Sequence, residues 1–270
     1  MSWARIMAPL SGGAGDAEIL AAAAAVARLF DAELAATHAP ADVADLMPWM
    51  GEGFMGGVQI SAMESLKEAA VEGERLAREA VAAVGYAKTT LISLQSPVWA
   101  GLSMESRLSD VVVFDQSAAC GRGPLAEAFQ QIVADEQRPV IVARRGLKVG
   151  GVVAVAWDGG KEASRAVRTA LPLLEKASGV VLIGAPAASN RRFDLGRLRD
   201  FLAVRGVKAS IEELSEGGDA GQILVAAARK AGADLLVAGA FGHPRLQEYI
   251  FGGTTRTLLN SDGPSLFLSH

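Results

Sequence analysis

The sequence contains very little of the chemistry that builds disulfides or metal centres. Of its 270 residues one is a cysteine, Cys120, and three are histidines. A single cysteine excludes an internal disulfide and any metal site made of several thiolates. The histidines His38, His243 and His270 are too widely spaced for a metal-ligand motif. We therefore expect no metal held by protein ligands, and the lone thiol fits a reducing, cytoplasmic setting.

Long apolar runs and runs of one charge are also missing. The most apolar helical segment, 19–30, is too short to span a bilayer and is flanked by acidic residues. The first residues lead straight into a strand-like segment, without the pattern of a secretory signal. The 26 basic and 30 acidic residues give a net charge of −4 and are scattered along the chain. We expect neither a membrane nor a nucleic acid as partner.

The second half alternates between strand-like and helical segments. Half of all residues are apolar and about a fifth are charged, which is typical of a globular chain. The expected strands are 151–156, 180–185, 208–214, 234–239 and 265–268. The expected helices are 161–178, with Pro172 as a local conflict, 195–205, 220–231 and 254–259. Such alternation predicts an α/β fold with an open, mostly parallel five-stranded sheet and helices on both faces.

The first half repeats this order less clearly, which predicts two tandem domains, 1–146 and 147–270. Segment 5–9 corresponds to 152–156, and Ser11-Gly12-Gly13 corresponds to Asp158-Gly159-Gly160. Further along, 110–114 corresponds to 234–238, and 139–143 corresponds to 264–268. Segment 40–58 has no counterpart in the second half. It is either an apolar lid or partner-binding loop, or a loop whose large side chains pack on the neighbouring domain.

Two loops of the second half should meet where the strands end, which is where open parallel sheets bind ligands. The residues expected to contact a ligand are Ala156, Asp158, Gly159, Ala238, Gly239, Gly242, His243, Gly252, Gly253 and Thr254. Glycines leave main-chain amides unshielded, and these amides favour an anion together with the positive end of a following helix. Thr254 and Thr255 either donate hydroxyls to a phosphate or cap that helix.

Each of these residues also has a purely structural interpretation. The glycines can serve tight packing of a loop on the sheet, and Asp158 can be a helix N-cap. His243 can be a solvated loop residue, while Arg245 and Arg256 either neutralise phosphates or face solvent, Arg245 paired with Glu248. No nucleophile–base pair and no paired carboxylates with an obvious role are recognisable. Catalysis is therefore not expected beyond slow turnover.

The spacing of the last glycines resembles a known signature. Gly239-x-x-Gly242, followed by nine residues and Gly252, is similar to the ATP-binding motif of the universal stress protein family. Segments 155–159 and 233–237 resemble that family's first strand with its aspartate-glycine turn and its fourth strand. The resemblance implies an adenine nucleotide alpha hydrolase-like fold. It places Asp158 at the adenine or ribose, Gly239 and Gly242 near ribose and phosphates, and Gly252 beneath the phosphates.

The resemblance also implies how two domains pair and what they do. Last strands of the family pair with each other, so 140–143 should pair with 266–269 about a pseudo-twofold axis. The expected function is a cytoplasmic regulatory protein of the stress response that binds ATP, alone or with Mg²⁺, in the second domain. Expected partners are this adenine nucleotide, a second copy of the chain in a homodimer, and an unidentified protein.

Two departures leave a rival interpretation open. Gly253 stands where the family's ATP binders have serine or threonine, so one hydroxyl contact is missing unless Thr254 supplies it. In the first half Ser11 replaces Asp158, and 115–124 lacks the spaced glycines; a nest at 121–123 competes with an ordinary turn into a helix. Because it lacks these residues, the first half is expected to support the second half structurally and to bind no nucleotide. The rival function is a module that binds a protein and no nucleotide; a third is a slow ATP hydrolase.

Overall fold

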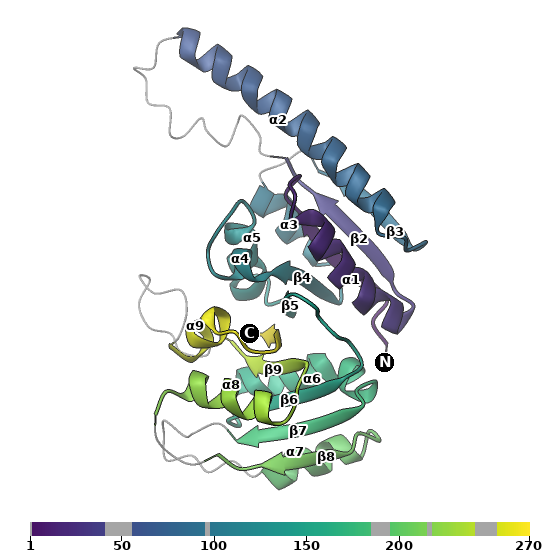
Figure 1. The fold of residues 1–270 in the computed structure, drawn as a ribbon, viewed down its shortest axis with the longest axis vertical. Coiled ribbons are helices and arrows are strands. Elements are labelled where there is room, and N and C mark those ends of the chain that lie inside the picture. Colours follow the sequence, from purple (N-terminus) through teal and green to yellow (C-terminus); the bar gives the residue numbers. More distant parts are fainter. Residues whose placement is uncertain (1, 41–55, 95–97, 185–194, 215–217, 241–252) are drawn as a thin grey trace. The chain divides into compact units, whose positions relative to one another are not determined.

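The computed structural model describes residues 2–40, 56–94, 98–184, 195–214, 218–240 and 253–270 (Figure 1). Within them the chain forms two compact units, Ala4–Ile132 and Val133–His270, the latter together with Met1–Trp3. Each unit is an open, mostly parallel sheet whose strands alternate with helices. The predicted α/β fold class is confirmed. No helix among the described residues is long and apolar enough to cross a membrane.

The unit Ala4–Ile132 has a four-stranded parallel sheet in the order β3-β2-β1-β4. Its strands are β1 (Arg5–Leu10), β2 (Glu33–His38), β3 (Thr89–Ser93) and β4 (Val111–Asp115). Its helices are α1 (Asp16–Phe30), α2 (Gly56–Ala83), α3 (Val98–Ser106), α4 (Gln116–Ala119) and the start of α5 (Ala126–Ala134). Phe114 and Phe129 meet edge to face in its core, with ring centroids 5.3 Å apart.

The second unit has the strand order β5-β10-β9-β6-β7-β8. Its strands are β5 (Val140–Ala143), β6 (Val152–Trp157), β7 (Gly179–Gly184), β8 (Ala209–Glu212), β9 (Leu235–Gly239) and β10 (Ser265–Ser269). Its helices are α6 (Lys161–Glu175), α7 (Leu195–Ala203), α8 (Ala220–Lys230) and α9 (Gly253–Asn260). All match the expected segments within a few residues, and α6 continues through Pro172.

Strand β5 joins the second unit by its pairing with β10. The two strands run antiparallel, with Phe267 opposite Ile141, which confirms the expected contact between the two last strands. On β10, Phe267 also stacks on Trp3, with centroids 6.0 Å apart. The compact units therefore divide at Ile132, while the sequence repeat predicts a division at residue 146, because the last strand of the first repeat packs on the second.

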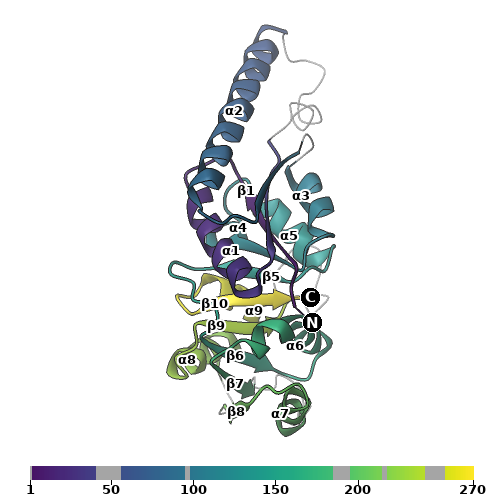
Figure 2. The same ribbon diagram turned by 90° about the vertical axis from the view of Figure 1, so that its right-hand side faces the viewer.

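Helix α2 is the largest departure from the sequence-based expectation. Its 28 residues begin at Gly56, so the expected loop 40–58 is wrong in its last three residues, and 41–55 lie outside the described part. Surface ion pairs follow the helix turns: Arg75 binds Glu72 and Glu79, and Arg78 binds Glu74. The early turns of α2 extend beyond the sheet of their unit (Figures 1 and 2).

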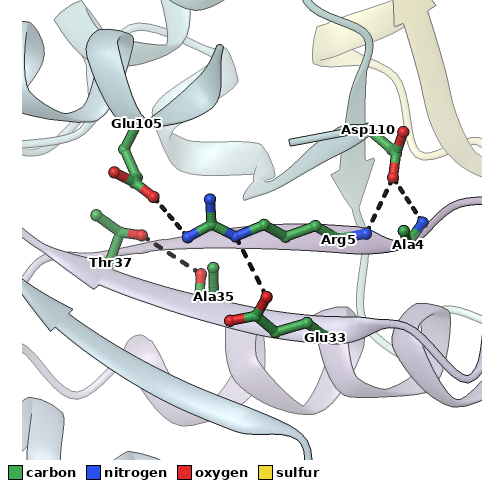
Figure 3. A network of polar contacts seen from close by, with 7 residues as sticks. All are labelled: Ala4, Arg5, Glu33, Ala35, Thr37, Glu105 and Asp110. Atoms are coloured by element: carbon green, nitrogen blue, oxygen red, sulfur yellow. Dashed lines mark hydrogen bonds and ion pairs between the residues drawn. The ribbon is translucent and has the colours of Figure 1, made fainter. Parts of the chain in front are cut away.

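Strands β1 and β6 both begin at a main-chain contact with an aspartate. Asp110, just before β4, accepts hydrogen bonds through Oδ2 from the N–H groups of Ala4 (2.6 Å) and Arg5 (2.9 Å) (Figure 3). Asp234, just before β9, likewise accepts from the N–H of Val152 at 3.2 Å. The side chain of Arg5 then pairs with Glu105 at 2.6 Å, and with Glu33 at 3.7 Å. These contacts tie the first strand of that unit to β2, α3 and β4.

Candidate functional site

The carboxyl ends of β6 and β9 meet at one edge of the second sheet. The strands pair in parallel, with Val155 opposite Val237, so both lead their following loops to the same side. Ala156 and Ala238, which were expected to contact the ligand, are buried at the ends of these strands. Their small side chains pack in the core, and any ligand contact they make comes from the main chain.

The side chain of Asp158 stabilises the turn that follows β6. Gly159 has a φ of 69°, which requires glycine in practice, and the N–H of Gly160 donates to Asp158 Oδ1 at 2.7 Å. The N-cap of α6 is Gly160, without a side-chain cap, so the N-cap interpretation of Asp158 is wrong. Among described residues Oδ2 has no bonding partner. This exposed carboxylate therefore keeps one oxygen for a ligand.

Gly239 lies directly against the first turn of α6. A Cβ at this position would come 2.5 Å from the main-chain nitrogen of Ala163 and 2.6 Å from the carbonyl carbon of Glu162. Close packing therefore requires glycine here, as the structural interpretation holds. The same approach brings the end of β9 and the Asp158 turn to the beginning of one helix.

Helix α9 follows β9 in the chain and packs on α8, where a Cβ on Gly221 would lie 3.1 Å from the carbonyl oxygen of Thr254. Gly253 is its first residue, with open space where a side chain would be. Thr254, exposed, and Thr255, buried, follow in the first turn, so neither threonine precedes the helix as an N-cap would. Gly242, His243 and Gly252 lie outside the described residues, as do Arg245 and Glu248. The described part of the chain contains no cluster of side chains that could hold a metal ion.

The sequence reasoning missed the contribution of β10 to this edge. The N–H of Ala240 donates to the carbonyl of Ser269 at 2.9 Å, and Nδ1 of His270 lies 3.1 Å from the carbonyl oxygen of Ala240. His270 thus contacts the chain where the last glycine loop begins. Strand β10 pairs in parallel with β9, with Ser269 opposite Gly239, and parallel neighbours end at the same edge of a sheet. The expected parallel sheet was the signal that could have pointed to it.

The corresponding turn of the first unit is occupied by a carboxylate of the chain itself. Gly12, with a φ of 73°, matches Gly159. Asp16 of α1 accepts from the N–H groups of Ser11 and Gly12, both at 2.9 Å, and from the Ser11 hydroxyl at 3.0 Å. Its side chain is 1% exposed. The amides that an anion would need in this turn are already bonded.

The end of β4 also differs from the end of β9. Asp115 stands where Gly239 stands, and it N-caps α4 by accepting from the N–H of Ala118 at 2.8 Å. The N–H of Gly121 then donates to the carbonyl of Ala118 at 3.0 Å, and that of Arg122 to Ser117 at 2.9 Å. Because the amides of Gly121 and Arg122 bond to carbonyls of α4, these two amides are not available to a phosphate. The segment is a turn between α4 and α5, which begins at Ala126.

His38 lies buried at the end of β2, close to Asp16 and α2. It is 2% exposed, and its Nδ1 has no hydrogen-bond partner among the described residues. Burial lowers the pKa of His38 below the ordinary value, while the charges of Asp16 and Glu74 act in the opposite direction. The lowered pKa favours the neutral form of the His38 imidazole, which lies near the carboxylates of Asp16 and Glu74.

Comparison with known proteins agrees with this geometry. Residues 191–261 match the universal stress protein family. No curated protein sequence matches the chain. A universal stress protein from Archaeoglobus fulgidus DSM 4304 has a similar structure, with a TM-score of 0.71 and 14% identity, over 98% of this chain and 95% of that chain.

Two structures from Pseudomonas aeruginosa are also similar over nearly the whole chain. A functionally unknown protein of strain PAO1 has a TM-score of 0.57 and 15% identity, covering 99% of this chain and 92% of that chain. A putative universal stress protein of strain UCBPP-PA14 has a TM-score of 0.53 and 17% identity, covering 99% and 93%. At these identities the similarity shows a common fold.

Proposed function

We propose that this chain, whose residues 191–261 match the universal stress protein family, is a regulatory protein of that family that binds ATP in its second half. The observation that carries the proposal is the meeting of the Asp158 turn and the Gly239 end of β9 at the start of α6. A carboxylate whose second oxygen has no partner among the described residues lies there beside half-buried main chain. Such a site suits a nucleoside whose phosphates extend toward the glycine loop.

Each described residue has a definite part in this proposal. Asp158 Oδ2 accepts from a ribose hydroxyl or from the adenine amino group, and the main chain at Gly239 borders the nucleoside. The amides at the start of α9, at Gly253 and Thr254, bind phosphate oxygens with help from the helix dipole. A Mg²⁺ ion would bind chiefly through the phosphates and water.

Gly253 weakens this site without removing it. The missing hydroxyl costs about 0.5–1.5 kcal/mol, or roughly three- to tenfold in affinity. The same glycine favours a second candidate function, a protein-binding stress-response module that holds no nucleotide. A third candidate, slow ATP hydrolysis, would appear as ADP formed over hours by the wild type and not by Asp158→Ala.

Calorimetric titration of the full chain with ATP, with and without Mg²⁺, tests the proposal. Asp158→Ala should lose about tenfold or more in affinity because one charged acceptor is removed. The matched control is Asp115→Ala, which also removes one carboxylate that accepts from one main-chain N–H, but in the first unit; it should bind ATP like the wild type.

The opposite result has a clear meaning. If the wild type gives neither heat nor a thermal shift at millimolar ATP, nucleotide binding is refuted and the protein-binding function stands instead. We also propose that two chains associate into a homodimer. Light scattering at the mass of one chain across all concentrations would contradict this association.

A further inference from the structure

We infer that Arg144, which follows the last strand of the first repeat, is a positioning residue for the phosphate-binding end of α9. The inference rests on the proposed function, because it concerns the same nucleotide site. The hydrogen bonds of Arg144 described below do not reach Asp158, Gly239 or the start of α9. Arg144 acts through α9, which connects the arginine at one end to the expected phosphate position at the other.

The contacts of Arg144 gather at the carboxyl end of α9. Its Nη2 donates to the carbonyl of Leu258, in the last turn of the helix, at 2.7 Å. Its Nη1 donates to the carbonyl of Pro264, just before β10. Its main-chain N–H donates to Ser265 Oγ at 3.1 Å. One residue thus joins the end of β5, the end of α9 and the start of β10.

The charge of Arg144 suits this position. The last carbonyls of a helix have no partner inside the helix and carry partial negative charge, so a guanidinium there is favourable. Helix α9 has eight residues, which at 1.5 Å per residue is about 12 Å. Over that length a helix moves as a rigid rod, so a fixed carboxyl end also fixes where the amides of Gly253 and Thr254 point.

Gly263 leaves the space that the guanidinium occupies. A Cβ on Gly263 would lie 3.1 Å from Arg144 Nη1 and 3.0 Å from Val225 Cγ1. Ser265, which accepts from the main chain of Arg144, is buried. The arginine therefore occupies a place shaped by neighbouring residues of α8 and of the segment that follows α9.

Arg144 and the helix that it contacts come from different repeats of the sequence. The residue belongs to segment 1–146 of the expected repeat, while α9 belongs to 147–270. The pairing of β5 with β10 brings it there. The first repeat, whose own turn is filled by Asp16, thus contributes to nucleotide binding by holding the helix of the second repeat.

The test compares ATP with adenosine in Arg144→Met and wild-type full-length chains. Methionine keeps an apolar stem of similar length and removes all guanidinium donors. We expect the Kd for ATP to rise about tenfold, the value of roughly one misplaced phosphate hydrogen bond. The Kd for adenosine should not change, because adenosine has no phosphate. Gly263→Ala, whose Cβ presses on the guanidinium without removing it, should show a smaller loss of the same selective kind.

Arg28→Met is the matched control. Arg28 also donates to two main-chain carbonyls, those of Val84 (3.2 Å) and Gly85 (2.9 Å), in the first unit. Its loss should leave both affinities unchanged, and thermal denaturation should show that every variant is folded. Unchanged ATP affinity in Arg144→Met, or equal losses for ATP and adenosine, would overturn the inference. If the wild type binds neither ligand, the proposed function itself fails.

Discussion

Gly12 and Gly73 lie in contact, so close that a Cβ on Gly12 would come 2.5 Å from the Cα of Gly73. Gly12 is in the turn after β1 and Gly73 is in the middle of α2. The two glycines let the helix approach the turn whose amides Asp16 has bonded. The first unit therefore closes this region with its own helix, where the second unit leaves the Asp158 turn exposed.

Gly12→Ala should destabilise the first unit strongly. The substitution adds a methyl group against main chain and also places alanine at a φ of 73°. Together we expect a loss of about 2–5 kcal/mol in the free energy of unfolding, measured by urea denaturation. Gly85→Ala is the control, since Gly85 has a φ of 61° but open space around it. Equal losses in both variants would show that the contact with Gly73 contributes nothing.

His38 should make the stability of the first unit depend on pH. Its pKa is lowered by burial in the folded state, so between that value and about 6.5 the unfolded chain binds more protons. Protons then stabilise the unfolded chain, and stability present above pH 6.5 is lost as the pH falls. The charges of Asp16 and Glu74 oppose this effect and limit its size.

Chemical denaturation at pH 8 and pH 5 measures the dependence. The wild type should lose more stability on acidification than His38→Gln, in which the position cannot titrate, by about 1.4 kcal/mol for each pH unit of difference between folded and unfolded pKa. Equal losses in the two proteins would mean that His38 does not titrate differently on folding.

Gly239→Ala should damage both folding and nucleotide binding. The added methyl would press on the main chain at Glu162 and Ala163, in the first turn of α6, at a cost of about 1–3 kcal/mol. Shifting that turn away from β9 should also weaken ATP binding in the same titration. Gly179→Ala is the matched strand control, because its Cβ would make an ordinary contact of 3.7 Å with Val152. If Gly239→Ala changes neither the stability nor the ATP affinity, Gly239 is not part of the nucleotide site.

Local patterns in the sequence predicted the second unit well. The alternation of buried strands and amphipathic helices is a short-range signal, and it gave each element from β6 to β10 within a few residues. The expected pairing of 140–143 with 266–269 was also correct. That pairing was inferred from the resemblance to a family rather than from the residues themselves.

What the sequence did not reveal depends on contacts between distant segments. Helix α2 is an exception, because its many Ala, Glu, Leu, Lys and Arg residues favour a helix by propensity, and no helix was assigned to this segment from the sequence. Asp16 bonds the amides of the turn at Ser11 and Gly12 only because α1 packs next to that turn. Strand order alone brings Arg144 to the last turn of α9 and His270 to Ala240 at the end of β9. None of these roles has a local signal.

Gly253→Ser should strengthen ATP binding. Gly253 has open space where the side chain would be, so a serine hydroxyl fits there and adds one hydrogen bond to a phosphate. We expect a three- to tenfold lower Kd, from about 0.5–1.5 kcal/mol. Gly253→Ala is the control, because it shares the gain in helix propensity but has no hydroxyl. If serine and alanine bind ATP equally, the start of α9 does not face the phosphates, and the nucleotide lies elsewhere or is absent.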